Sequence, residues 1–182
     1  MGASESSFGN YLDGESLKIQ RFLPGPIQRV WDYLTDSDLR SQWLAAGVMN
    51  PEPGSEFEFV WRNSELDGGP ARGKAADDPE CAAEEFRMSS EIVSWEPPYR
   101  LVFTWSGSGN VIVELEERGE EVLLTLTHFK LPDRATIIGV SSGWHAHLDY
   151  LLARLANTQP EPFWDNYNRL REHYEKRVAE LS

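Results

Sequence analysis

The chain has 182 residues and a formal net charge of −13, a length that fits one domain and a charge that disfavours binding to nucleic acid or to an anionic membrane surface. Apolar residues make up 40% of the chain, which argues against disorder, yet no apolar run approaches the ~18 residues of a membrane span. Cys81 is the single cysteine, which excludes an internal disulfide and, with no signal peptide at the N-terminus, predicts a cytoplasmic protein.

The first part of the chain combines a polar leader with one strand and two short helices. Alternating apolar and polar residues predict a half-buried strand. Pro26 suits the first turn of a helix, and a capping-box pattern that begins at Thr35 starts a second helix. The elements predicted here are a loose leader over 1–14, a strand over 16–22, and helices over 26–34 and 35–44.

A region rich in strands follows, interrupted by one long polar loop. The strands are separated by short turns, which favours an antiparallel meander. We expect a short strand near Val48 and further strands over 56–61, 86–95, 99–105, 110–117 and 121–129. The loop covers 63–83 and contains a weak strand pattern over 71–75; a loop this long is either functional or mobile.

Two amphipathic helices end the chain. In the first, predicted over 141–157 and capped by Ser142, apolar residues recur at helical spacing from Trp144 to Leu155. This helix must bury its stripe against the sheet, and the space between them is either packed core or a pocket. The second helix carries a stripe from Phe163 to Val178. We favour packing of that stripe within the chain, with contact to a second copy as the alternative, so the chain is a monomer or a homodimer.

Three motifs, in this order, resemble the AHSA group of the START-like (SRPBCC) superfamily, the homologues of a heat-shock chaperone ATPase activator. They are VWDYLTDSDLRSQWL over 30–44, EIVSWEPPYRLVFTW over 91–105, and LTLTH over 124–128 followed by Gly143, Trp144 and Leu148. The resemblance implies an α+β helix-grip fold, with a curved six- or seven-stranded antiparallel sheet wrapped around one long helix. Two short helices would follow the first strand. The domain would span 15–157, with an extra C-terminal helix over 158–182.

A ligand cavity in such a fold would lie between the sheet and the long helix. Residues of one parity on each strand should face the helix, because side chains alternate between the two faces of a strand. A packed core built from the same side chains is the alternative, since an apolar lining suits both. The candidate lining residues are Phe57, Phe59, Trp61, Met88, Phe103, Trp105, Val113, Leu126, His128, Trp144 and Leu148.

Reactive groups are few. His145 and His147 are two residues apart, so they point about 200° apart on a helix and cannot hold one metal. His128 could act as an acid or base in a pocket, or be a hydrogen-bonded histidine at the rim of the core. No nucleophile motif, phosphate loop or dinucleotide fingerprint occurs. We therefore assign no catalytic residue, no metal and no cofactor.

Three functions from different classes remain. The first is binding of a small apolar or aromatic molecule between the sheet and the long helix. The second is a protein-interaction module with a closed core that engages a chaperone or another protein, as the AHSA resemblance implies, which would connect it with a stress response. The third is an enzyme of cyclase or hydrolase type that uses His128, and it ranks last.

Overall fold

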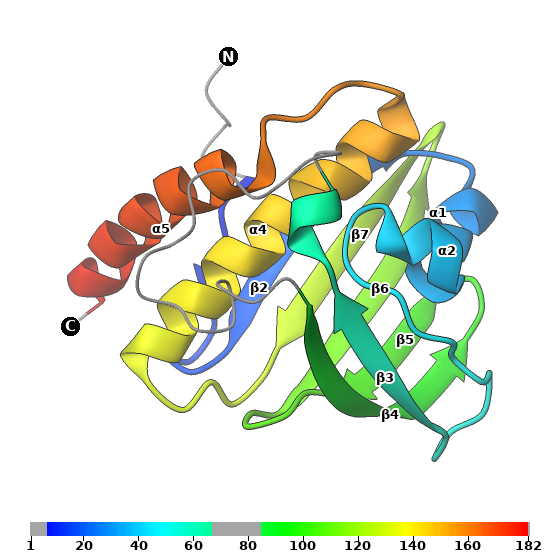
Figure 1. Ribbon diagram of the computed structural model, residues 1–182, viewed down its shortest axis with the longest axis horizontal. Coiled ribbons are helices and arrows are strands. Elements are labelled where there is room, and N and C mark those ends of the chain that lie inside the picture. Colours follow the sequence, from blue (N-terminus) through cyan, green and yellow to red (C-terminus); the bar gives the residue numbers. More distant parts are fainter. Residues whose placement is uncertain (1–6, 67–84, 182) are drawn as a thin grey trace.

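The computed structural model describes residues 7–66 and 85–181, which form a seven-stranded antiparallel sheet and the helices that cover it (Figure 1). The strands are β1 (Asn10–Tyr11), β2 (Leu17–Pro24), β3 (Glu56–Trp61), β4 (Phe86–Glu96), β5 (Arg100–Thr104), β6 (Asn110–Arg118) and β7 (Glu121–His128). The helices are α1 (Ile27–Thr35), α2 (Ser37–Ser41), the 3-10 turn η2 (Asn63–Glu65), α4 (Arg134–Ala156) and α5 (Phe163–Glu180).

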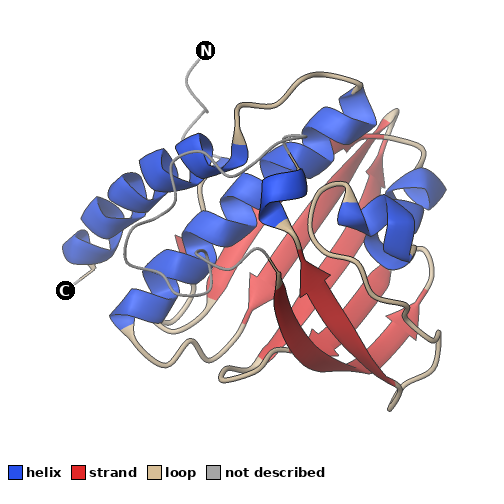
Figure 2. Ribbon diagram, in the orientation of Figure 1, coloured by secondary structure: helices blue, strands red, loops and turns tan. Residues whose placement is uncertain are grey.

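The sheet has the order β1-β2-β7-β6-β5-β4-β3. The meander from β3 to β7 is continuous, and β2 then pairs with β7, which brings Leu17 opposite His128. A register shift between Ile92 and Ser94 interrupts the β4–β5 ladder; such irregularities bend a strand. Figure 2 shows the helices gathered on the face around which the strands curve. This arrangement confirms the predicted α+β helix-grip fold, with seven strands in the part of the chain that the structure describes.

Helix α4 is longer than the sequence predicted. It begins at Arg134 rather than at residue 141, and its cap is Asp133, whose carboxylate accepts a hydrogen bond from the Thr136 amide at 2.7 Å. Ser142 is therefore not a cap; its hydroxyl donates to the carbonyl of Ile138. Gly139 and the β-branched residues between Thr136 and Val140 hid the first two turns of the helix, because both kinds of residue have low helix propensity.

The second short helix and the Val48 strand also differ from the prediction. Helix α2 ends at Ser41 rather than Leu44, and the Asp36 side chain caps it in place of Thr35. Arg40 is the buried residue of this helix. Val48 is exposed and belongs to no strand, whereas Ala46 forms an isolated bridge to Val60.

Helix α5 lies alongside α4, and its apolar stripe is buried within the chain (Figure 1). Phe163, Tyr167, Leu170, Tyr174 and Val178 are all at most 6% exposed. The N-terminal segment also takes part, because the Gly9 amide donates to the Tyr174 hydroxyl at 2.9 Å and β1 pairs with β2. The stripe therefore packs intramolecularly, whereas the oligomeric state stays a prediction.

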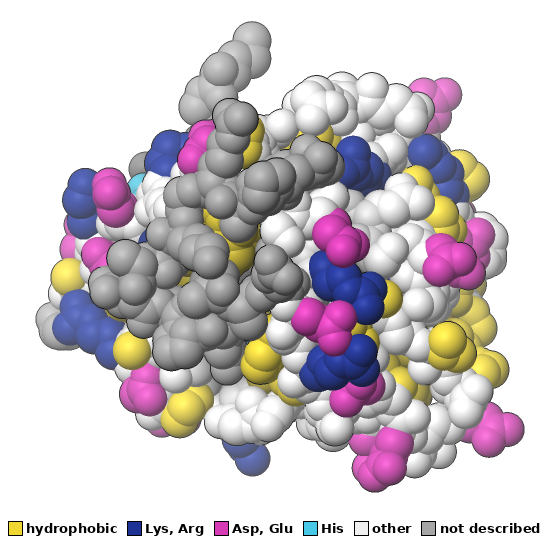
Figure 3. Space-filling model, viewed as in Figure 1, with side chains coloured by type: hydrophobic (Ala, Val, Ile, Leu, Met, Phe, Trp, Pro, Cys, Tyr) yellow, Lys and Arg dark blue, Asp and Glu magenta, His cyan; other side chains and the backbone are white. Residues whose placement is uncertain are grey.

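Most of the charge lies on the surface. Figure 3 shows acidic and basic side chains interleaved over β3 and β4. Ion pairs join Arg87 to Glu58 and Glu85, and Arg62 to Glu85. In the described part of the chain, no helix is both long and apolar enough to cross a membrane. The predicted strand at 71–75 and Cys81 lie outside the described residues.

Candidate functional site

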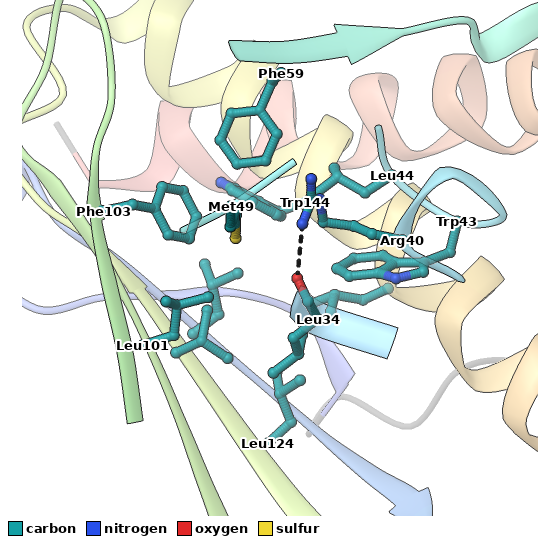
Figure 4. A pocket seen from close by; sticks show the side chains of 13 residues that line it. Leu34, Arg40, Trp43, Leu44, Met49, Phe59, Leu101, Phe103, Leu124 and Trp144 are labelled. Carbon is teal, nitrogen blue, oxygen red and sulfur yellow. Dashed lines mark hydrogen bonds between the residues drawn. The ribbon is translucent and has the colours of Figure 1, made fainter. Parts of the chain in front are cut away.

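The space between the middle of α4 and the sheet is nearly filled. Figure 4 shows Phe59, Phe103 and Met49, from different segments, directed into the same space. Only about 10 Å³ remains there, which is at the limit of what one water molecule needs. The space between the middle of α4 and the sheet is thus a packed hydrophobic core, which was the alternative to a ligand cavity at this position.

A larger pocket of about 480 Å³ lies at the N-terminal half of α4. Its walls come from the end of β3, the start of β4, the β5–β6 turn, α4 and the first turns of α5. Among the described residues, six Trp, Phe and Tyr rings line it: Trp61, Phe86, Trp105, Trp144, Phe163 and Tyr167. Three of the rings form a continuous group, because Trp105 lies 5.7 Å from Trp61 and 5.2 Å from Trp144 between ring centroids.

Helix α4 contributes a row of small residues to this pocket. Ala135, Gly139 and Gly143 follow one another at i, i+4 and i+8, so they lie on one face of the helix. A Cβ atom added at Gly139 or Gly143 would meet no atom within 4 Å. Each glycine costs the helix about 1 kcal/mol relative to alanine. The pocket therefore exists partly because α4 carries no side chain larger than a methyl group at these three positions.

His147 continues the row by one turn and is also part of the pocket wall. Its Nδ1 lies 2.7 Å from the Trp43 carbonyl oxygen. A carbonyl only accepts hydrogen bonds, so Nδ1 carries the hydrogen and Nε2 holds a lone pair. Burial lowers the pKa of His147 to about 4, so the ring is neutral at pH 7.

His128 is held by hydrogen bonds on both ring nitrogens. The indole Nε1 of Trp144 donates to Nδ1 at 3.1 Å, so Nε2 carries the hydrogen and donates to the Ser108 hydroxyl at 2.7 Å. The side chain is fully buried, and burial lowers the pKa of His128 to about 4. This geometry favours the structural interpretation of His128, which fixes the Trp144 ring that forms part of the pocket wall.

The third histidine of this region faces away from the pocket. His145 Nδ1 lies 2.9 Å from the Tyr174 hydroxyl, and its Nε2 lies 3.7 Å from an oxygen of Asp149. His145 and His147 thus have different neighbours. Among the residues that the structure describes, no group of three or more His, Cys, Asp or Glu side chains is arranged to hold a metal ion.

The family follows from comparison with known proteins. The family model described as "Activator of Hsp90 ATPase homolog 1-like protein" matches residues 24–156. The chain belongs to this family. The match ends at the last residue of α4, so α5 and the two residues that it contributes to the pocket lie outside the family model.

Solved structures agree with this assignment. The protein encoded by gene BPP1335 of Bordetella parapertussis is 37% identical, with 97% of this chain and 95% of that chain covered and a TM-score of 0.77. CalU16 of Micromonospora echinospora is 21% identical, with 90% and 88% covered and a TM-score of 0.62. A protein from Enterococcus faecalis, EF2215, is 16% identical, with 92% and 86% covered and a TM-score of 0.68. The last two share the fold. No curated protein matches the chain.

In this AHSA1-like chain, the candidate lining residues separate into three groups. Trp61, Trp105 and Trp144 line the larger pocket. Phe57, Met88 and His128 are buried and line neither of the two pockets described. Five other candidates, Phe59, Phe103, Val113, Leu126 and Leu148, line the nearly filled central space, and Trp144 borders it as well.

Sequence reasoning missed several pocket residues. The row Ala135, Gly139 and Gly143 had a detectable signal, namely small residues spaced by four. Asn63 and the aromatic residues of α5 had none, because the chain distance between them and α4 says nothing about their position in space. Their placement depends on how α5 docks.

Proposed function

We propose that the chain binds a small apolar or aromatic molecule in the pocket beside the N-terminal half of α4. The observation that carries the proposal is the pocket itself: about 480 Å³ lined by six aromatic rings. Pockets for small molecules are usually ~300–1,000 Å³ in volume and mostly apolar, with a few polar groups. The fold supports the proposal further, since members of the SRPBCC superfamily often bind hydrophobic ligands.

The glycine row gives a test in which binding and stability change in opposite directions. Gly139→Leu and Gly143→Leu would each place a side chain in the pocket, where a Cβ meets no neighbour. Because leucine has a higher helix propensity than glycine, we expect each variant to be more stable by up to about 1 kcal/mol. We also expect each to bind the neutral dye N-phenyl-1-naphthylamine at least about tenfold more weakly, the result of losing about 1.4 kcal/mol of contact.

Dye fluorescence and urea unfolding measure the two quantities. Ala156→Leu is the matched control, because Ala156 is exposed at the end of α4 and lies outside the pocket lining; its dye affinity should equal that of the wild type. If wild-type protein binds no dye, or if both glycine variants bind it unchanged, the pocket is not a ligand site.

The family description favours a second candidate, a partner of Hsp90-type chaperones that stimulates their ATPase. The nearly filled centre of the fold is compatible with this role. Purified chaperone should then turn over ATP faster when the chain is added. An unchanged rate over a range of concentrations would remove this candidate and leave the ligand proposal intact. A reaction through His128 has less support, because both of its ring nitrogens are engaged.

A further inference from the structure

The pocket and the filled core follow one another along the same strands. On β3, Phe59 lines the nearly filled central space, and Trp61, two residues further on, lines the pocket. Phe103 of β5 and Trp105, which directly follows that strand, repeat this division. Residues two apart on a strand point to the same face. Both spaces therefore lie between one face of the sheet and α4.

Helix α4 shows the same division. Gly143 and His147 line the pocket, whereas Leu148 lines the central space. Leu44 and Trp144 are the two described residues that line both, and Figure 4 shows them among the side chains that enclose the central space. The indole of Trp144 and the smaller side chain of Leu44 thus form the wall between the pocket and the core.

The Trp144 ring is held in this wall by two kinds of contact. Its Nε1 donates to His128 Nδ1 at 3.1 Å, and the fully buried His128 donates in turn to the Ser108 hydroxyl at 2.7 Å. The Trp105 ring packs against the indole with 5.2 Å between the ring centroids. The indole cannot turn aside without losing both the hydrogen bond and the ring contact. The wall is therefore a fixed part of the pocket.

Little space remains on the core side of the wall. About 10 Å³ is left there, and the share of one water molecule in the liquid is already about 30 Å³. The Phe59 ring lies 5.1 Å from the Trp61 ring and 6.1 Å from the Trp105 ring between centroids. The aromatic side chains of the core are thus in contact with those of the pocket. A ligand that reaches Trp144 finds no further apolar space in this direction.

We infer that Trp144 is the residue that sets the size limit of the ligand. It ends the pocket at the edge of the core, so the site takes compact aromatic molecules, and a long alkyl chain directed toward the core gains no contact beyond the indole. This inference rests on the proposed function, since it names the residue that selects among ligands in the same pocket.

A series of neutral ligands that differ only in chain length tests the size limit. Phenyl alkyl ketones with chains from methyl to nonyl are suitable, and equilibrium dialysis against the full chain gives their dissociation constants. Each CH₂ group that is buried tightens binding about fourfold, the equivalent of about 0.8 kcal/mol. With the wild type, we expect affinity to rise with the first additions and then to level off, because later CH₂ groups stay in water.

Two variants open the wall. Trp144→Leu keeps an apolar side chain but removes the indole, so the ligand chain can extend further toward the core. The ratio of the affinities for the nonyl and the methyl ketone should then rise at least about tenfold, the effect of burying about two further CH₂ groups. Large-to-small substitutions destabilise a core, so far-UV circular dichroism checks the fold. The milder Trp144→Phe should change the ratio less, in the same direction.

Leu101→Ala is the matched control. Leu101 is 1% exposed and lines the central space but not the pocket. The substitution therefore makes a void on the core side and leaves the indole in place. The ratio of the two ketone affinities should equal that of the wild type.

The outcomes separate this inference from the function on which it rests. If no ketone binds to the wild type, the proposed function fails and the inference fails with it. The pocket is a ligand site without the proposed limit if affinity for the wild type rises through the whole series. The limit does not belong to Trp144 if the folded Trp144 variants keep the wild-type ratio, or if Leu101→Ala raises it as much as they do.

Discussion

Replacing Arg40 with leucine is expected to lower the free energy of unfolding by about 3–5 kcal/mol. Arg40 is 1% exposed and has no ion pair with a carboxylate among the described residues. Burial lowers its pKa to about 10, so the guanidinium stays charged at neutral pH. Four backbone carbonyls accept its hydrogen bonds, and the Asp36 carboxylate favours its charge from beyond ion-pair distance.

Those carbonyls explain why the loss would be large. Arg40 donates to the carbonyls of Leu34, Thr35, Ala45 and Gly47. The first two belong to the last turn of α1, where the helix itself supplies no partners. The other two lie in the chain that leads to β3. Leucine offers no donor, so it would leave these groups unpaired where water cannot easily replace them.

Urea unfolding of the variant measures the change, and Arg118→Leu provides the control. The Arg118 side chain is 52% exposed and pairs with Glu116 on the surface, so its loss should have little effect. We expect the free energy of unfolding of Arg40→Lys to lie between those of the wild type and Arg40→Leu. Lysine keeps the positive charge but lacks the planar guanidinium that donates to several carbonyls at once. Equal stability of the two leucine variants would show that the carbonyl contacts are not stabilising.

Acidification is expected to destabilise the protein steeply between about pH 6.5 and pH 4. Burial lowers the pKa of His128 and His147 to about 4 and that of His145 to about 3. An unfolded histidine takes up a proton near pH 6.5, whereas these three in the folded state do not until pH 4 or below. The stabilisation that the protein gains from keeping these histidines neutral is therefore complete above pH 6.5, and it is lost as the pH falls.

The slope follows from proton linkage. Each histidine contributes about 1.4 kcal/mol per pH unit within its window, so the three together contribute about 4 kcal/mol per pH unit near pH 5. Arg21, Arg169 and His173 add positive charge around His145 and lower its pKa further. The nearby Asp149 acts in the opposite direction, because burial raises the pKa of its carboxyl, and it offsets part of the loss at the acidic end.

Urea midpoints measured across this pH range test the prediction, and single variants assign it. His128→Gln can keep one hydrogen bond to Trp144 or Ser108 without titrating, so about a third of the slope should disappear. His173→Gln is the comparison, because His173 is only half-buried and should change the slope less. A stability that does not depend on pH between 5 and 7 would contradict the burial of neutral histidines.

Local pattern was enough to predict most of the fold. Strand alternation placed the sheet, because side chains point alternately to two faces whatever the neighbours are. The end of α4 was also predicted from the sequence, because asparagine readily adopts the left-handed conformation that ends a helix. Asn157 adopts this conformation, with a φ of 52°. The start of α4 was not predicted, because Gly139 and the β-branched residues before it have low helix propensity.

Long-range packing decided the site. The sequence determined that an aromatic-rich sheet would close on one long amphipathic helix, since periodicity and propensity are properties of neighbouring residues. Only the tertiary structure decided that the centre of this fold is nearly filled and that the open space lies at the start of α4, where Trp61, Trp105 and Tyr167 line it. Whether a space stays empty depends on how side chains from distant segments pack together, and a local sequence pattern does not contain this information.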